Sequence, residues 1–141
     1  MSTEENKNIV RRYQDIYNSN ELDGLDEIMI ADVLTPKIVP GLPPGLEGAK
    51  AVHAMAIAGM TDFHTEILDL VAEEDKVVAR VLITGIHTGT FFGIPATGKR
   101  VEFTGMYMVR IANGKIVEHW GEEDGVSLLG QLGMIPKMGE L

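Results

Sequence analysis

The pattern of apolar and polar positions divides the chain into a helical half followed by a strand half. Near the N-terminus, apolar residues recur with the spacing of one helix face: Ile9, Val10, Tyr13, Ile16 and Tyr17. This helix is expected to end at the Asn-Ser-Asn run of residues 18–20, whose side chains compete for backbone hydrogen bonds. A second apolar set predicts a short helix: Leu22, Leu25, Ile28 and Met29. Residues 35–44 hold four prolines and cannot be continuous helix, whereas residues 45–59 are expected to form a third helix.

From Phe63 onward the pattern is typical of strands joined by turns. Four segments rich in β-branched or alternating apolar residues are predicted as strands: residues 63–71, 76–90, 99–111 and 115–120. Asn113-Gly114, between the last two, is a strong hairpin signal. Helices followed by antiparallel strands indicate an α+β fold. We expect a curved antiparallel sheet wrapped around the N-terminal helices, forming a cone with an internal pocket between the layers.

Length and charge narrow the class of protein. The 141 residues are expected to form one domain spanning residues 1–141. A formal net charge of −9 opposes binding to nucleic acid and to anionic membranes. The sequence has no cysteine, and no apolar run approaches the roughly 20 residues that cross a bilayer. The start, MSTEENKN, lacks the basic and apolar regions of a signal peptide, so we expect a soluble cytoplasmic protein.

Motifs that bind cofactors or metals are missing from the sequence. It contains no glycine-rich dinucleotide or phosphate loop, no HExxH and no EF-hand loop, and no serine lies in GxSxG. No two of its histidines lie four residues apart on a helix: His53, His64, His87 and His119. We therefore expect neither a metal site nor a cofactor.

The candidate catalytic residue is a carboxylate near the C-terminus. Asp124 follows the last predicted strand, close to Trp120, and precedes a short amphipathic segment. An aspartate has an ordinary pKa of about 4 and is a poor general base unless burial, or the neighbouring Glu122 and Glu123, raise that pKa. An aspartate between a strand and a helix is also a common helix N-cap. The sequence leaves both roles open.

The hairpin register decides which side chain of the last strand faces the pocket. Tyr107 shares one face of its strand with the other odd-numbered residues from 101 to 111. If Asn113-Gly114 forms a two-residue turn, Trp120 lies opposite Tyr107. A bulged three-residue loop would shift the register by one and bring His119 beside Tyr107 instead. Asn-Gly favours the first arrangement, and the sequence leaves the second open.

Three further residues are candidates for contact with a ligand. His87 alternates with the apolar residues of its strand and is expected at the mouth of the pocket. Tyr13, on the first helix, is a candidate lid as well as a candidate core residue. Phe91 begins the loop that follows the strand of His87.

Short segments spread along the chain carry a family resemblance: Gly85-Ile86-His87-Thr88-Gly89, the run from Phe92 to Arg100, Met108-Val109-Arg110-Ile111, Gly114-Lys115-Ile116 and Gln131-Leu132-Gly133. These segments resemble those of the SnoaL-like polyketide cyclases. That family belongs to the nuclear-transport-factor-2-like superfamily, whose cone is shared with ketosteroid isomerase and scytalone dehydratase. The resemblance extends over nearly the whole chain, and it implies the cone with an internal pocket.

The resemblance also implies a reaction and a set of residues. In those cyclases an aspartate removes an activated proton between two carbonyls, and the enolate closes a ring by aldol addition without metal or cofactor. Counting back from the Gln-Leu-Gly signature places this aspartate on Asp124. A pocket histidine of the cyclases falls on Tyr107, and Trp120 stands where they carry a polar residue. A homodimer or a higher homo-oligomer is implied as well.

Three classes of function follow. As an enzyme, the protein would use Asp124 as the base, with His119 as a second catalytic residue and Tyr107 or His87 supporting the enolate of a small apolar or aromatic keto substrate. A cofactor-free hydroxylase or an isomerase would need the same base. Alternatively, the cone could hold an apolar ligand without chemistry, or the outer face of the sheet could serve mainly to form a homodimer.

Overall fold

Residues at its two ends set the bounds of the first helix. In the computed structural model, which describes residues 2–36 and 39–136, helix α1 (Thr3–Ser19) starts with a capping box between Ser2 and Glu5. It ends at Asn20, whose φ of 58° lies in the left-handed region that asparagine tolerates. The apolar side chains of Val10 and Ile16 are buried. The predicted helix and its end are confirmed.

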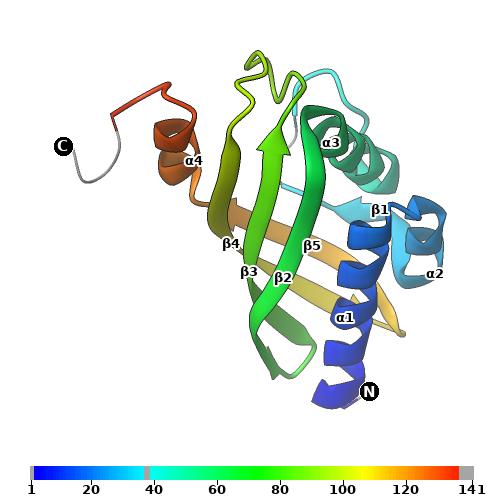
Figure 1. Ribbon diagram of the computed structural model, residues 1–141. Helices are drawn as coiled ribbons and strands as arrows, with labels where there is room; N and C mark the ends of the chain where they lie inside the picture. Colours follow the sequence, from blue (N-terminus) through cyan, green and yellow to red (C-terminus); the bar gives the residue numbers. More distant parts are fainter. Residues whose placement is uncertain (1, 37–38, 137–141) are drawn as a thin grey trace.

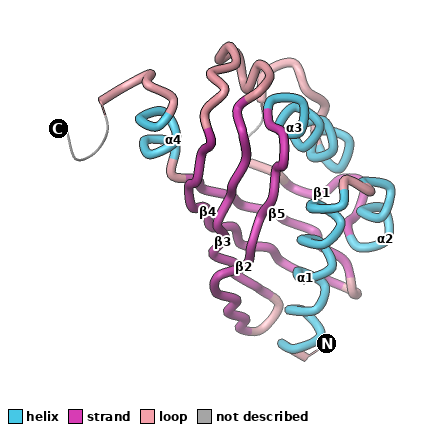
Figure 2. Tube along the Cα trace, viewed as in Figure 1, coloured by secondary structure: helices cyan, strands magenta, loops and turns pink. Residues whose placement is uncertain are grey.

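Five strands form one curved sheet in the order β1-β5-β4-β3-β2 (Figures 1 and 2). Neighbouring strands pair antiparallel, except that β1 and β5 are parallel. The elements in chain order are α1 (Thr3–Ser19), η1 (Leu22–Gly24), α2 (Leu25–Ile28), β1 (Met29–Leu34), α3 (Gly45–Gly59), β2 (Met60–Glu73), β3 (Lys76–His87), β4 (Arg100–Ala112), β5 (Lys115–Glu123) and α4 (Gly125–Gln131). The predicted α+β class and curved sheet are confirmed, but the sheet is mixed rather than wholly antiparallel.

The strand β1 is not predicted by the sequence pattern, which assigns Met29 to the second helix. In the structure α2 ends at Ile28, and Met29 already has extended backbone, with φ −139° and ψ 138°. Met29 and Val33 are buried, and Met29 pairs with Ile116 of β5. A strand whose partner lies so far along the chain leaves little local signal, which explains why this part of the prediction is wrong.

Helices α1 and α3 pack against the sheet on the side that holds the core. α1 contacts β2 and β3, whereas α3 contacts β1 and β2. The core between these layers is a single cluster of buried apolar side chains that includes Val10, Leu46, Val81, Phe103 and Val109. α4 lies at the other end of the molecule, against β4 (Figure 1). This arrangement leaves the inner face of β4 and β5 partly uncovered between α1 and α3.

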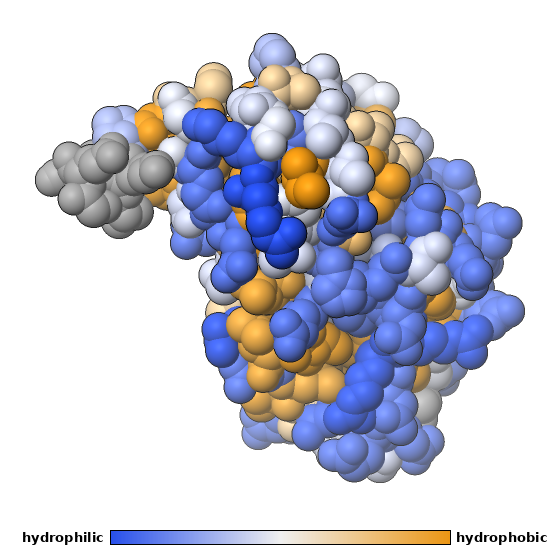
Figure 3. Space-filling view, viewed as in Figure 1, coloured by the Kyte–Doolittle hydropathy of each residue, from blue (hydrophilic) through white to orange (hydrophobic). Residues whose placement is uncertain are grey.

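The surface separates polar helices from apolar strand positions. In the view of Figure 3, α1 is mainly hydrophilic, and an apolar area lies over the strands beside it. Three of the larger exposed apolar side chains are Val71, Met106 and Trp120. No helix in the described ranges combines the length and the apolar character that a membrane span requires.

Candidate active site

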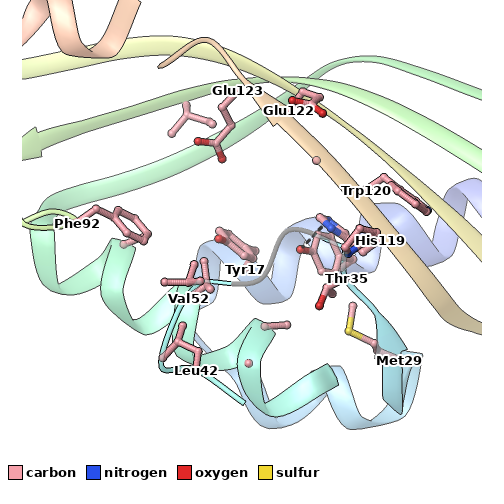
Figure 4. A pocket seen from close by; sticks show the side chains of 18 of the residues that line it. Tyr17, Met29, Thr35, Leu42, Val52, Phe92, His119, Trp120, Glu122 and Glu123 are labelled. Carbon is pink, nitrogen blue, oxygen red and sulfur yellow. Dashed lines mark hydrogen bonds between the residues drawn. The ribbon is translucent and has the colours of Figure 1, made fainter. Parts of the chain in front are cut away.

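A cavity of about 520 Å³ opens between the inner face of the sheet, α1, α3 and residues 35–36 and 39–43 (Figure 4). Its walls are mainly aliphatic and aromatic: Met29, Val39, Leu42, Val52, Ala56, Phe63, Ile83, Phe91, Phe92 and Phe103. Polar groups line it from α1 and β5: Tyr13, Tyr17, His119, Glu122 and Glu123, with Trp120 beside them. A smaller cavity of about 100 Å³ shares the first five of these residues and adds Tyr107 and Gln14. The larger volume is typical of a small-molecule site.

A bulge in β5 decides which of its side chains faces the cavity. Asn113 and Gly114 form a two-residue turn with φ of 52° and 76°, as the sequence favours. The pairing then skips Val117: Ile111 pairs with Ile116, but Val109 pairs with His119. This one-residue shift turns His119 to the inner face. Tyr107 pairs with Gly121 rather than with Trp120 or His119, so the register is neither of the two considered, although the bulge within the strand still brings His119 to the face of Tyr107.

His119 is held among aromatic side chains. Its Nε2 lies 3.4 Å from the hydroxyl of Tyr13. The ring of Tyr107 stacks on the imidazole, with centroids 5.2 Å apart and planes at 21°. The Tyr107 hydroxyl in turn donates a hydrogen bond of 2.8 Å to Oε1 of Gln14, a buried residue of α1. Two of the sequence-predicted residues, Tyr13 and Tyr107, are therefore brought together with His119.

Burial sets the protonation of this cluster. Desolvation lowers the pKa of His119 to about 4, because the charged imidazolium loses water. Desolvation also raises the pKa of Tyr13, Tyr17 and Tyr107. At neutral pH the imidazole is therefore uncharged and the phenols keep their protons. These protonated phenols can donate hydrogen bonds to a bound group that gains negative charge, and the neutral imidazole adds no positive charge to the site.

Glu123 brings a carboxylate to the same cavity. It pairs with Gly105 across the β4–β5 ladder and lines both cavities. In Figure 4 its carboxylate is directed into the cavity, toward Tyr17. Its negative charge contributes, after burial, to the raised pKa of Tyr17. Glu123 is not among the candidate residues predicted from the sequence. Strand alternation could have indicated it, since Glu123 lies on the same face of β5 as His119 once the register is known.

Asp124 lies in a different environment from the one expected of a buried base. It is exposed, and its Oδ1 accepts a hydrogen bond of 3.1 Å from the backbone N–H of Ser127 at the start of α4. It lines neither cavity. The structure therefore gives Asp124 the capping role that the sequence left open, and its role in proton transfer stays a prediction.

His87 and Phe91 meet near the loop that follows β3. His87 is fully buried, and its ring nitrogens lie 2.9 Å from Oγ1 of Thr97 and 3.2 Å from the carbonyl oxygen of Ile94. It lines neither cavity, so the structure places it behind the loop instead of at the expected pocket mouth. Phe91 lines the larger cavity and contacts the ring of His87. His87 positions this loop through both ring nitrogens.

Trp120 lines the larger cavity at its edge, with much of its side chain in solvent. It pairs with Met108, and its side chain is 44% exposed. Figure 4 shows its ring pointing away from the cavity that His119 enters. The bulge at Val117 is the reason, since it exchanges the faces of these two neighbours. Among the described residues, no group of three histidine or acidic side chains is arranged to hold a metal ion.

Known proteins with similar sequences or folds identify the family. The family model SnoaL-like polyketide cyclase matches residues 7–132. Aklanonic acid methyl ester cyclase DauD of Streptomyces sp. (strain C5) is 30% identical over 128 residues, covering 89% of this chain and 80% of the relative. Its counterpart DnrD of Streptomyces peucetius is 31% identical over 128 residues, with 89% and 88% covered. The solved structure of TsrD from Streptomyces laurentii matches with a TM-score of 0.87 at 28% identity, covering 96% of this chain and 99% of TsrD. The chain therefore belongs to the SnoaL-like polyketide cyclase family.

Proposed function

We propose that this protein removes a proton from an activated carbon of an apolar aromatic keto substrate and closes a ring by intramolecular aldol addition. The observation that carries the proposal is the cluster of protonated phenols and a neutral imidazole in the wall of an otherwise apolar cavity. The names of the relatives DauD and DnrD, both cyclases, support the reaction class.

The cluster suits the charge that this reaction creates. Loss of a proton between two carbonyls puts negative charge on an enolate oxygen, and one preorganised donor can stabilise such charge by about 3 kcal/mol. Tyr17 and Tyr13 are held protonated by burial and can supply such donors. The enolate carbon then attacks a second carbonyl of the same molecule and forms one C–C bond. The resulting alkoxide takes up the proton that the base received, so the reaction needs no oxidant.

The charge in the cavity favours an uncharged substrate. The carboxylate of Glu123, an exposed residue that lines the cavity, opposes a second negative charge beside it. An ester of an aromatic keto acid carries no such charge, whereas the free acid does. The names of DauD and DnrD both refer to a methyl ester. We infer that the substrate enters this pocket as a neutral ester or ketone.

Deuterium exchange tests this function directly. Aromatic 1,3-dicarbonyl compounds, each as methyl ester and free acid, are incubated in heavy water, and loss of the activated proton is followed by NMR. We expect the protein to accelerate exchange of the esters. Val52→Phe, which fills the cavity from α3, should abolish that acceleration. Val71→Phe is the matched control, because Val71 is 64% exposed and lines neither cavity.

Each other outcome assigns a different function. Binding of the esters without accelerated exchange would contradict the enzyme and identify a protein that holds an apolar ligand. A product heavier by one oxygen atom would identify a cofactor-free hydroxylase. Faster exchange of the acids than of the esters would contradict the inferred substrate class. Equal effects of the two valine substitutions would place the reaction outside this cavity.

A further inference from the structure

The end of β5 carries three consecutive carboxylates that lie in three different surroundings. Glu122 pairs with the exposed Met106, on the face away from the core. Glu123 pairs with the buried Gly105, on the face of the cavity. Asp124 ends the strand and caps α4. Glu122 and Glu123 both line the two cavities, but strand alternation directs the Glu123 carboxylate into the larger one, as Figure 4 shows.

Gly105 leaves the space that the side chain of Glu123 occupies. A Cβ atom at position 105 would lie 3.2 Å from Cγ of Glu123 and 3.5 Å from Cδ1 of Ile83. A side chain at this position would therefore press on Glu123 and change its direction. The glycine allows the Glu123 carboxylate to reach the cavity from the neighbouring strand (Figure 4).

The carboxylate of Glu123 lies close to the groups that would hold an enolate. Its charge contributes to the raised pKa of both Tyr17 and Tyr13, after the larger effect of burial. Between Glu123 and His119, on the same face of β5, stands Gly121. A Cβ at position 121 would make only ordinary contacts, 3.6 Å to His119 and 4.0 Å to Tyr107. The strand thus leaves room for a reacting carbon between the carboxylate and the imidazole.

We propose that Glu123 is the general base of this cavity. The proposal rests on the proposed function and identifies the residue that starts the reaction by removing the proton. The Glu123 carboxylate takes the proton from the activated carbon, and the electron pair of the C–H bond becomes the enolate, which the phenolic hydroxyls stabilise. After the C–C bond forms, Glu123 returns the proton to the alkoxide. The role that the resemblance assigns to Asp124 is then performed by the adjacent residue.

A glutamate outside the site supplies the matched control for the test. Glu123→Gln keeps the size and polarity of the side chain but cannot accept the proton. We expect its exchange rate constant to fall at least ~100-fold, the usual contribution of a general base, while the Kd of the ester changes less than about threefold. Glu66→Gln is the same substitution at an exposed position of β2 that lines neither cavity, and its rate should stay within about twofold of wild type. Circular dichroism and Tm confirm that each variant is folded.

Chemical rescue separates a base from a structural residue. In Glu123→Ala, the space vacated by the side chain admits formate, so added formate should restore exchange in a concentration-dependent way. Formate should leave the exchange rate of Glu66→Ala unchanged. A residue that only supports the fold would not be replaced by a small free carboxylate, so an absence of rescue would overturn the proposal even if Glu123→Gln were unstable.

The outcomes distinguish this inference from the function beneath it. If wild type accelerates exchange and Glu123→Gln does so equally well, the inference is wrong and the proposed function stands. A selective loss in Asp124→Asn would assign the base to Asp124. Equal losses in Glu66→Gln and Glu123→Gln would reveal a general charge effect and also overturn the assignment. If wild type accelerates none of the reactions, the proposed function fails, and the assignment of a base fails with it.

Discussion

The half-buried imidazole of His119, in the wall of the cavity, should make the folded state sensitive to acid. Desolvation lowers the pKa of His119 to about 4 in the folded protein, whereas an unfolded histidine has a pKa of about 6.5. Below pH 6.5 the unfolded chain therefore takes up a proton that the folded protein does not. The group contributes its full stability above pH 6.5 and loses it as the pH falls toward 4.

The two pKa values give the size of the effect. Between pH 7.5 and pH 5, the difference in proton uptake at this one site lowers the free energy of unfolding by about 2 kcal/mol. Other groups also titrate in this interval, and burial lowers the pKa of His53 as well. Their contributions are shared by a variant that lacks only His119. The comparison of wild type with His119→Asn therefore isolates this site.

Urea unfolding at the two pH values measures the difference. Wild type should lose about 2 kcal/mol more than His119→Asn on going from pH 7.5 to pH 5. His64→Asn, the same substitution at an exposed position of β2, is the matched control for the loss of a histidine elsewhere in the chain. An equal loss in wild type and His119→Asn would refute the reasoning, since it would mean that His119 takes up its proton equally in both states.

Three other substitutions test the structure around the pocket. Tyr107→Phe leaves Oε1 of the buried Gln14 without its hydrogen bond and should lower the free energy of unfolding by about 1–2 kcal/mol in urea titrations. Gly59→Ala should lower Tm, with a cost of about 1–3 kcal/mol, because a Cβ there would lie 2.8 Å from side-chain atoms of Phe91; an unchanged Tm would contradict this packing. Deleting Val117 should exchange the two faces of the rest of β5 and weaken ester binding at least ~10-fold by calorimetry, whereas unchanged binding would show that the bulge does not set the pocket.

Much of the fold is predictable because it depends on local patterns. The period of α1 and its Asn-rich end, the third helix and the Asn113-Gly114 turn all follow from residues close together in sequence, and the structure confirms them. The strand β1 is different. Its extended backbone is stabilised by pairing with β5 near Ile116, and no periodicity of its own six residues indicates that partner.

The candidate site likewise contains side chains that the sequence pattern placed correctly and others whose position depends on the tertiary structure. Tyr13, Phe91 and His119 were selected from the sequence and line the larger cavity, and Tyr107 lines the smaller one. His87 was placed at the pocket mouth, but the loop that folds over it engages both ring nitrogens. These two contacts form only when the loop folds back over His87, so strand alternation alone could not predict them.

The sequence by itself determined the α+β class, the hairpin turn and the family, since each depends on residue types and short spacings. Only the tertiary structure decided the directions of the side chains along β5. A strand alternates with a period of two, so the single extra residue at Val117 exchanges the two faces of the strand. That exchange places His119 and Glu123 on the inner face of β5, and leaves Trp120 and Glu122 on the other face at the edge of the cavity, while Asp124 caps α4. A one-residue bulge has no strong sequence signal, yet it determines which carboxylate a substrate meets.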